Sequence, residues 1–300
     1  MPLFGNNKKM QAILILAHKD LPQVTKLALI LNRRFKVYIH FDKKMVLTQA
    51  DLKILDDNNI HHLSEVAVNW GSWSIGEATV RLMRLALDDP KISYIHVISG
   101  QDWITQSVDK LYERFDKDSK IYMTYEKAKD VKKSGEPIIW WQKYYFNYDQ
   151  IQRRTFFGKF YHRALLLGQT LLRVNKFKKL NIDLEIYAGA NWVDLPRDAA
   201  TYCLNYLDNH PNLQKMLQTG CFSDEFWMQT ILCNSSKFKD RIVNDHHRYI
   251  KWEKQNESYP AILDDRDLST ILEGDYFFAR KLETKYSHSL INKLDQKNGN

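Results

Sequence analysis

The chain has 300 residues, of which 44% are hydrophobic and 27% charged, as is ordinary for a folded domain with a substantial core. Its formal net charge of +8 favours a polyanionic partner: nucleic acid, an anionic membrane or a phosphorylated small molecule. Cys203, Cys221 and Cys233 form no CxxC pair, which argues against a disulfide framework or a zinc site and favours a reducing compartment. The chain start has no apolar signal region, and no apolar run approaches the roughly 18 residues of a membrane span.

Strands and helices alternate over the first hundred residues. The apolar run 11–18 (QAILILAH) predicts a buried strand, a helix-spaced segment follows, and 35–42 (FKVYIHFD) predicts a second strand. A helix over 76–88 and a third strand over 93–103 come next. This pattern predicts a parallel sheet that binds ligands at the carboxyl ends of its strands. No GxGxxG follows the first strand and no GxxxxGK[ST] occurs, which speaks against a dinucleotide enzyme or a P-loop NTPase.

Residues 150–182, the basic segment, contain eight Lys or Arg and no Asp or Glu, interleaved with Phe, Tyr and Leu. They fit a helix lying on an anionic membrane surface. They fit equally a solvated helix whose basic face packs on the domain.

The last third of the chain mixes short elements. A strand and a glycine-containing turn begin at 184, and a helix begins near Pro196. A short strand is predicted over 246–252, and 259–282 predicts a turn, a short helix and an aromatic-basic end. Residues after about 285 read as a polar, frayed tail.

Two adjacent acids mark the segment 221–230 (CFSDEFWMQT). Asp224 and Glu225 stand at the head of a largely apolar helix, for which Ser223 is a suitable N-cap. The residues alone leave two interpretations open: a helix start, or a general base in an aromatic sugar-binding pocket.

Several motifs in chain order resemble the core-2/I-branching family of glycosyltransferases, which includes β-1,6-N-acetylglucosaminyltransferases and peptide O-xylosyltransferases. They are ILAHKD, VYIHFDKK, VNWGSWSIGEATVRLMRLAL, YIHVISGQDW, GANWVDLPRDAA, FSDEFWMQTIL and YFFARKL. The resemblance covers about residues 11–283. It implies an α/β, GT-A-like glycosyltransferase fold with a Rossmann-like nucleotide-binding half, an inverting mechanism, a UDP-sugar donor and no divalent metal.

The expected organisation is one catalytic domain over 11–285 between two tails. Its nucleotide-binding half is 11–105 and its acceptor and catalytic half is 106–285. The tails are 1–10 and the polar 286–300.

The resemblance implies that Glu225 is the catalytic base, because it matches the second acid of the family's DE pair. Asp224 is then expected to be a favourable anion in the first helical turn or a hydrogen-bond orienter. Arg280 and Lys281 match the family's C-terminal basic pair and would neutralise the leaving diphosphate. The triplets DKD (116–118) and DRD (265–267) do not follow core strands, so neither is expected to bind metal.

Further residues are assigned to the donor and the acceptor by their place in these motifs. The expected donor-binding residues are His18, Asp42, Trp70, Trp73, Ser74, Arg280 and Lys281, with Arg248 or Lys251 as a second cation. For His18 a role in the core is an equal alternative. The expected acceptor-binding residues are Trp192, Asp102, Asp224 and Glu126, and the aromatic pair Trp140 and Trp141 reads either as acceptor stacking or as core.

The expected activity is transfer of a sugar, N-acetylglucosamine first, from a UDP-sugar to a glycan hydroxyl in cell-surface polysaccharide or oligosaccharide synthesis. Transfer from UDP-xylose, UDP-glucose or UDP-galactose is one alternative, and a non-catalytic nucleic-acid-binding protein is another. Without the membrane anchor, stem and many cysteines of the animal members, the chain resembles the compact bacterial members of the family, so we expect a cytoplasmic enzyme, either free or peripheral on the inner membrane face. Its acceptor would be an oligosaccharide or lipid-linked glycan, and it would need no cofactor.

Overall fold

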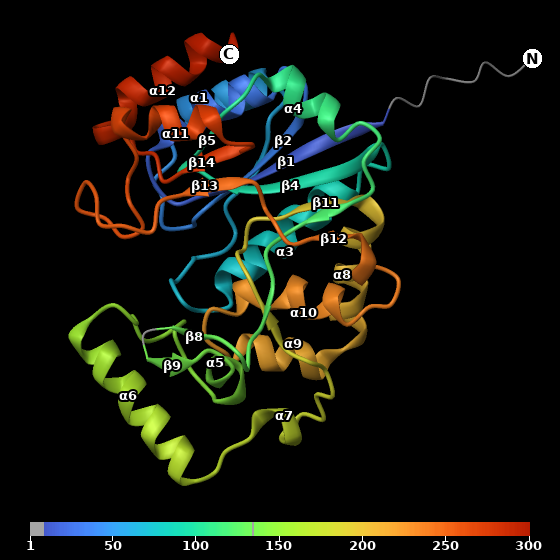
Figure 1. The fold of residues 1–300 in the computed structure, drawn as a ribbon, viewed down its shortest axis with the longest axis vertical. Helices are drawn as coiled ribbons and strands as arrows, with labels where there is room; N and C mark the ends of the chain where they lie inside the picture. Colours follow the sequence, from blue (N-terminus) through green and yellow to red (C-terminus); the bar gives the residue numbers. More distant parts are fainter. Residues whose placement is uncertain (1–8, 134) are drawn as a thin grey trace, which may run out of the picture.

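The computed structural model describes residues 9–133 and 135–300; residues 1–8 of the expected N-terminal tail lie outside the described residues. A seven-stranded sheet in the order β12-β6-β11-β4-β1-β2-β3 crosses the molecule, with helices on both faces (Figure 1). The predicted α/β class is confirmed.

The parallel part of the sheet consists of β1 (Met10–Ala17), β2 (Lys36–Phe41), β3 (His61–Leu63) and β4 (Ile92–Ser99). β1 pairs in parallel with β2 and β4, and β2 pairs in parallel with β3. The three strands predicted in the first hundred residues are therefore confirmed. Ala12 and Leu14 of β1 enter one core and Ile13 and Ile15 the other. Because both faces are covered, β1 is a continuous apolar run rather than an alternating one.

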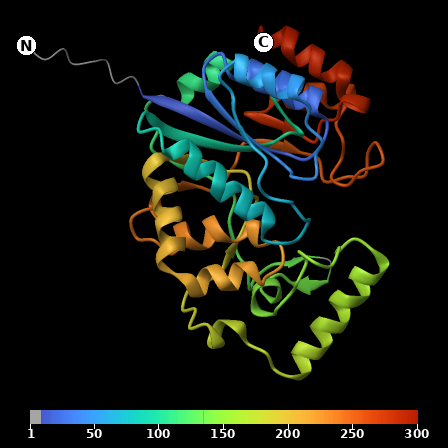
Figure 2. The ribbon, with the colours of Figure 1, turned by 180° about the vertical axis from the view of Figure 1, so that it is seen from behind.

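Helices form a layer on each face of the sheet (Figures 1 and 2). One layer contains α1 (Leu21–Leu31), α2 (Gln49–Asp57), α4 (Val108–Arg114), α11 (Leu268–Glu273) and α12 (Thr284–Asn298). The other contains α3 (Ser74–Leu87), α8 (Arg197–Asn209), α9 (Pro211–Gln218) and α10 (Trp227–Cys233). Each layer contributes buried apolar side chains to one of the two cores.

The expected polar tail 286–300 is instead a helix, and this prediction was wrong. Leu290, Ile291 and Leu294 of α12 are buried in the core shared with α1. The Trp103 Nε1–H donates to Asp295 Oδ1 at 2.9 Å. The apolar positions 290, 291 and 294 have the i, i+1, i+4 spacing of one helical face.

An antiparallel segment extends the sheet beyond β4. β11 (Asp194–Pro196) pairs antiparallel with β4 and with β6 (Ile121–Tyr122), and β12 (Ile242–Val243) pairs in parallel with β6. A separate three-stranded sheet is formed by β13 (Arg248–Ile250), β14 (Phe278–Arg280) and β5 (Asp102–Ile104). It brings the C-terminal basic pair to the end of β4.

The remaining elements are short, apart from one helix. They are β7 (Glu126–Lys127), β8 (Lys132–Lys133), β9 (Glu136–Pro137), β10 (Tyr187–Ala188), α5 (Trp140–Lys143), α6 (Phe156–Leu171), α7 (Lys176–Lys179) and the 3₁₀ turns η1 (Ser223–Glu225), η2 (Lys239–Arg241) and η3 (Asp265–Asp267). The helix α6 lies at the outer edge of the molecule in both ribbon views (Figures 1 and 2). Among the described residues, no helix combines the length and apolarity needed to cross a bilayer.

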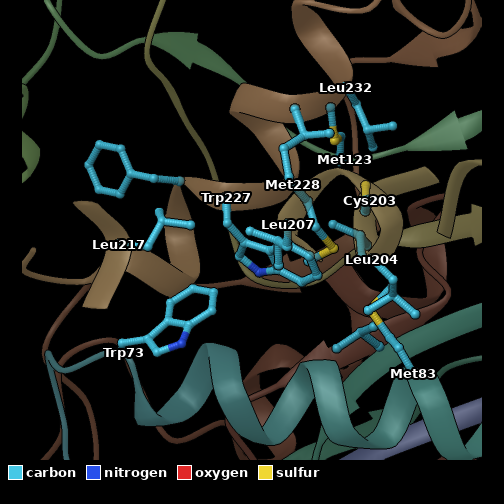
Figure 3. Close-up of a cluster of buried hydrophobic side chains, with 14 of the residues drawn as sticks. Trp73, Met83, Met123, Cys203, Leu204, Leu207, Leu217, Trp227, Met228 and Leu232 are labelled. Carbon is cyan, nitrogen blue, oxygen red and sulfur yellow. The ribbon is translucent and has the colours of Figure 1, made fainter. Parts of the chain in front are cut away.

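The core below the sheet contains Trp73, which the sequence assigns to the donor. Its ring is 6% exposed and meets the Trp227 ring edge to face at 6.1 Å (Figure 3). The ring also covers Gly76, where an added Cβ would lie 2.4 Å from it. Trp73 is therefore a core residue that supports the start of α3 and does not offer a face to a ligand.

Candidate active site

Donor candidates from the sequence lie where the parallel strands end. Asp42 follows β2, is buried, and its Oδ1 accepts the backbone N–H of Lys44 at 3.0 Å and of Val68 at 3.1 Å. This fixes the loop after β2. His18 follows β1 and reaches the surface. Desolvation of its ring by the residues packed around it is the largest effect on its pKa and lowers it, while Asp42 opposes this shift and Arg280 adds to it. His18, Asp42 and Arg280 are therefore neighbours.

Asp102, Trp192 and Arg280 form one interlocked cluster. Asp102 Oδ2 accepts Trp192 Nε1–H at 3.0 Å, and Asp102 Oδ1 accepts Arg280 Nη1–H at 3.1 Å. The guanidinium of Arg280 lies 3.7 Å from the centre of the Trp192 ring. Asp102 is fully buried. It therefore orients Trp192 and Arg280, and it does not line an acceptor pocket as its assignment assumes.

Lys281 belongs to a crowded group of cations. Burial, and then the charges of Arg280, Arg154 and Lys19, lower the pKa of Lys281 to about 8. Arg154, from the start of the basic segment, places its guanidinium 4.2 Å from the centre of the Trp70 ring. Lys19 is paired with Glu283 and Arg280 with Asp102, and the remaining positive charge of this group is suited to a strongly negative ligand such as a diphosphate.

Glu225 ends the 3₁₀ turn η1, directly before α10. Its side chain is 29% exposed, and its Oε2 lies 3.3 Å from Lys133 Nζ. The turn differs from the predicted helix start, because Ser223 Oγ–H donates to Leu217 O at 2.6 Å and caps nothing. Phe222, at φ 53°, provides the sharp bend that directs the chain into the turn.

Asp224 is buried beside Glu225. Burial, and then the negative charge of Glu225, raise the pKa of the Asp224 carboxyl well above its usual range. A raised pKa disfavours the helix-start anion that the sequence suggests for Asp224. Its Oδ1 has no hydrogen-bond partner among the described residues, nor have the neighbouring buried atoms Asn191 Oδ1, Trp227 Nε1 and Gln229 Oε1. Such a concentration of unpaired polar atoms is typical of a site completed by water or a ligand.

The segment 189–192 joins the acid and the cations. The Gly189 N–H donates to the carbonyl of Glu225 at 2.8 Å, while Trp192 contacts Arg280 and Asp102. Three residues span at most about 11 Å, so Glu225 and the basic pair lie in the same part of the molecule. Gly189 has no room for a side chain, since an added Cβ would lie 1.8 Å from the carbonyl oxygen of Thr124.

Of the predicted donor residues Trp70, Trp73 and Ser74, only Trp70 has an exposed aromatic ring. Trp70 is 46% exposed and meets Phe222 edge to face at 4.7 Å. Ser74 is buried, and its Oγ accepts the Asn69 N–H at 2.7 Å, so it serves the loop and not a ligand. Trp141 is also buried, at 4.9 Å from Phe222, which favours its core interpretation.

The second cation assigned from the sequence is not available. Arg248 is fully buried and its Nη2–H donates to Asp194 Oδ1 at 2.8 Å. Lys251 Nζ donates to Asp267 Oδ1 at 3.1 Å, and it is largely covered. Arg154 instead comes close to Lys281, and neither Arg154 nor Lys133 was singled out from the sequence. Their positive charge is the only sign of such a role in the sequence, because each contacts site residues that are distant along the chain.

Glu126 and Trp140 lie at the margin. Glu126 is exposed on β7 and pairs through its backbone with Ala188, next to Gly189. Trp140 packs at 5.9 Å from Tyr144, which joins it to the core.

Within 9–133 and 135–300, no group of three or more His, Cys, Asp or Glu side chains has the arrangement of a metal site. In the DRD triplet, Asp267 is buried and bonds Lys251, and Asp265 lies 2.8 Å from Lys293 Nζ. A wide, open hollow lined by Lys91, Asp116 and Arg241 lies at the amino ends of β1 and β4, opposite the strand ends described above. This hollow therefore lies at the opposite end of the strands from Arg280 and Lys281.

Three comparisons relate the chain to known proteins. A sequence model of the family described as the core-2/I-branching enzyme matches residues 12–272. The β-glucuronosyltransferases GlcAT14A and GlcAT14B of Arabidopsis thaliana are 25% and 24% identical to the chain over 123 residues. These matches cover 41% of this chain but only 27% and 28% of the two relatives. The crystal structure of core-mannan synthase A (CmsA/Ktr4) from Aspergillus fumigatus, in its Mn/GDP form, aligns with a TM-score of 0.39 and 10% identity over 80% of this chain and 74% of that one.

Proposed function

This chain belongs to the core-2/I-branching family of glycosyltransferases, and on that premise we propose that it transfers N-acetylglucosamine from a UDP-sugar to a glycan hydroxyl. The proposed transfer inverts the anomeric centre, needs no divalent metal and serves the synthesis of a cell-surface polysaccharide or oligosaccharide. The observation that carries the proposal is the segment 189–192, which contacts Glu225 at one end and Arg280 at the other.

In the proposed reaction, Glu225 is the base. Its carboxylate takes the proton of the acceptor hydroxyl while the oxygen attacks the anomeric carbon from the side opposite UDP. Lys133 balances the charge of Glu225 until the acceptor arrives. Arg280 and Lys281, with Arg154 beside them, take up the negative charge of the departing diphosphate, the task that a metal ion has in other glycosyltransferases.

The donor sugar follows from the resemblance and not from the pocket, so other donors stay in the proposal as alternatives. UDP-xylose, UDP-glucose and UDP-galactose fit the same nucleotide site. The plant relatives are named as glucuronosyltransferases, which adds UDP-glucuronate to the donors to be compared. Family membership favours a transferase over the nucleic-acid-binding alternative.

The test is release of UDP from a panel of UDP-sugars in EDTA by the wild type, Glu225→Gln and the control Glu113→Gln. Glu113 is an exposed acid on α4, remote from Glu225. We expect slow hydrolysis of one donor by the wild type and the control. We expect a loss of about 10²–10⁴-fold in Glu225→Gln, as for removal of a general base, with UDP affinity retained.

Each contrary outcome points to a different part of the proposal. Activity that disappears in EDTA and returns with Mn²⁺ would contradict metal independence alone. Full activity in Glu225→Gln would remove Glu225 as the base. Failure of every UDP-sugar to bind would contradict the donor class.

A further inference from the structure

The helix α6 is held against the domain by one narrow face. Gly158, His162 and Leu166 are its buried residues. His162 Nε2 lies 2.9 Å from Glu136 Oε2, and its ring stacks on Phe146 at 5.3 Å. At Gly158 an added Cβ would lie 2.0 Å from Gln152 O, so the helix start sits directly on the preceding loop. These contacts fix α6 in one orientation.

The opposite face of α6 exposes large apolar side chains. Their exposed fractions are 90% for Phe156, 63% for Phe157, 65% for Phe160, 63% for Leu167 and 73% for Leu171. At 3.6 residues per turn these five side chains fall within an arc of roughly 100°. They therefore form one continuous stripe, which we call the α6 stripe. Leu172, directly after the helix, extends it and is 79% exposed.

Positive charge borders the α6 stripe. Lys159 and Arg163 are exposed and lie along one side of the arc. The whole basic segment 150–182 has eight cationic residues and no acid. Docking two copies of this face would bring like charges together and is therefore disfavoured. An apolar stripe with cations along one side and no acid in its segment instead complements a surface that is apolar inside and negative outside.

We propose that the α6 stripe inserts into the interface of an anionic lipid bilayer, with Lys159 and Arg163 at the level of the lipid phosphates. This surface contact is independent of the proposed sugar transfer. It would nevertheless orient the active site, because the loop before α6 reaches it. Arg154 lies against Trp70, and Asn69 Nδ2–H donates to the carbonyl of Asp149 at 3.2 Å. Binding through α6 places the nucleotide site close to the membrane surface.

The test is co-flotation of the full chain with vesicles of phosphatidylcholine alone, or of phosphatidylcholine with phosphatidylglycerol. We expect the wild type to float with the anionic vesicles and to be released by high salt. The variant Phe157→Ser/Phe160→Ser/Leu171→Ser should lower the partition coefficient by about tenfold or more, since apolar burial drives insertion. Lys159→Glu/Arg163→Glu should lower it on anionic vesicles only.

Matched controls change the same chemistry elsewhere. Val46→Ser/Ile54→Ser removes exposed apolar side chains on and before α2, and Lys117→Glu/Lys239→Glu reverses two exposed charges near the sheet edge. Both controls should float like the wild type. All variants should keep the circular dichroism and the UDP-sugar hydrolysis of the wild type, which separates this proposal from the proposed function.

Three results would overturn the membrane contact. The first is a wild type that stays in the bottom fraction with anionic vesicles at low salt. The second is a loss of binding in the controls as strong as in the α6 variants. The third is a dimer in light scattering that the triple serine variant dissociates, which would make the stripe a contact between copies.

Discussion

Asp102 has no exposed surface, yet it sets the positions of two residues that do reach the site. The aspartate follows β4, Arg280 ends β14, and Trp192 precedes β11, so three distant segments meet at one carboxylate. The sequence motifs could place Asp102 and Arg280 in one region because both belong to recognisable blocks. They could not show that Arg248 forms a buried ion pair with Asp194, or that Lys133 and Arg154 reach the site. These contacts depend on how distant segments pack.

In the proposed nucleotide site, Lys281 should make UDP binding depend on pH. Burial and neighbouring cations lower its pKa to about 8, so its positive charge is present below that pH and is lost as the pH rises through it. We expect UDP affinity to be constant from about pH 6.5 to 7 and to fall above pH 8. Calorimetric titration of UDP across this range measures the effect. In Lys281→Arg the alkaline fall should disappear, because arginine stays charged; a fall that persists would assign it to another group.

Among the elements, α12 and α7 each contain a feature that local sequence patterns do not predict. α12 itself is rich in polar residues such as Lys and Asn, and its few apolar residues matter only because they share one face. Lys176 of α7 is fully buried, although lysine ordinarily marks a surface. Its Nζ donates to the carbonyl of Met216 at 2.8 Å and lies 5.2 Å from the Tyr145 ring centre.

Leu294 tests the structural role of α12. Its side chain is fully buried, so Leu294→Ala should lower the free energy of unfolding by about 2–5 kcal/mol, as for other large-to-small core changes. Urea denaturation followed by circular dichroism measures this loss. The exposed Lys297→Ala on the same helix should change stability by less than about 0.5 kcal/mol. Equal effects of the two substitutions would indicate that the segment is the frayed tail that its composition suggests, and not a packed helix.

Lys176 makes stability rise with pH. Burial lowers its folded-state pKa to about 7, below the unfolded value of 10.5, so between these values the unfolded chain binds more protons. The free energy of unfolding should therefore increase from about pH 7 toward pH 9 relative to Lys176→Met, which has no titrating group. Denaturation of both proteins at matched pH values gives this difference. A difference that does not change with pH would show that Lys176 keeps its charge when folded.

Across the whole molecule, a buried ion cluster ties the two sheets together. Arg248 of β13 pairs with Asp194 of β11, and His96 Nδ1 of β4 lies 2.8 Å from Asp194 Oδ1. Burial alone would raise the pKa of Asp194, but Arg248 and His96 outweigh it and lower the pKa to about 2. The parallel strands were predictable from their apolar runs. The antiparallel insertion of β11 was not, because the partners of a three-residue strand are decided by tertiary packing.

Substitution of Arg248 tests whether its ion pair with Asp194 holds the two sheets together. In Arg248→Gln the carboxylate of Asp194 stays buried without its main partner, so stability should fall by about 3–5 kcal/mol at pH 7. Arg266→Gln, which breaks a largely exposed pair with Asp264, should cost less than about 1 kcal/mol. Thermal and chemical unfolding measure both. In the wild type, the contribution of Asp194 should be present above about pH 4 and lost as the pH falls toward 2. A stable Arg248→Gln variant would mean that the two sheets do not depend on this pair.

The raised pKa of the Asp224 carboxyl offers a spectroscopic reporter for the candidate active site. A protonated carboxylic acid absorbs in the infrared apart from the carboxylates that dominate the surface, and isotope labelling of aspartate would identify its band. Because the negative charge of Glu225 contributes to the raised pKa of Asp224, Glu225→Gln should let Asp224 ionise at a lower pH, while burial still holds it above its usual range. The same band should shift when an acceptor hydroxyl reaches Glu225, so substrate arrival could be followed by vibrational spectroscopy before any bond is made.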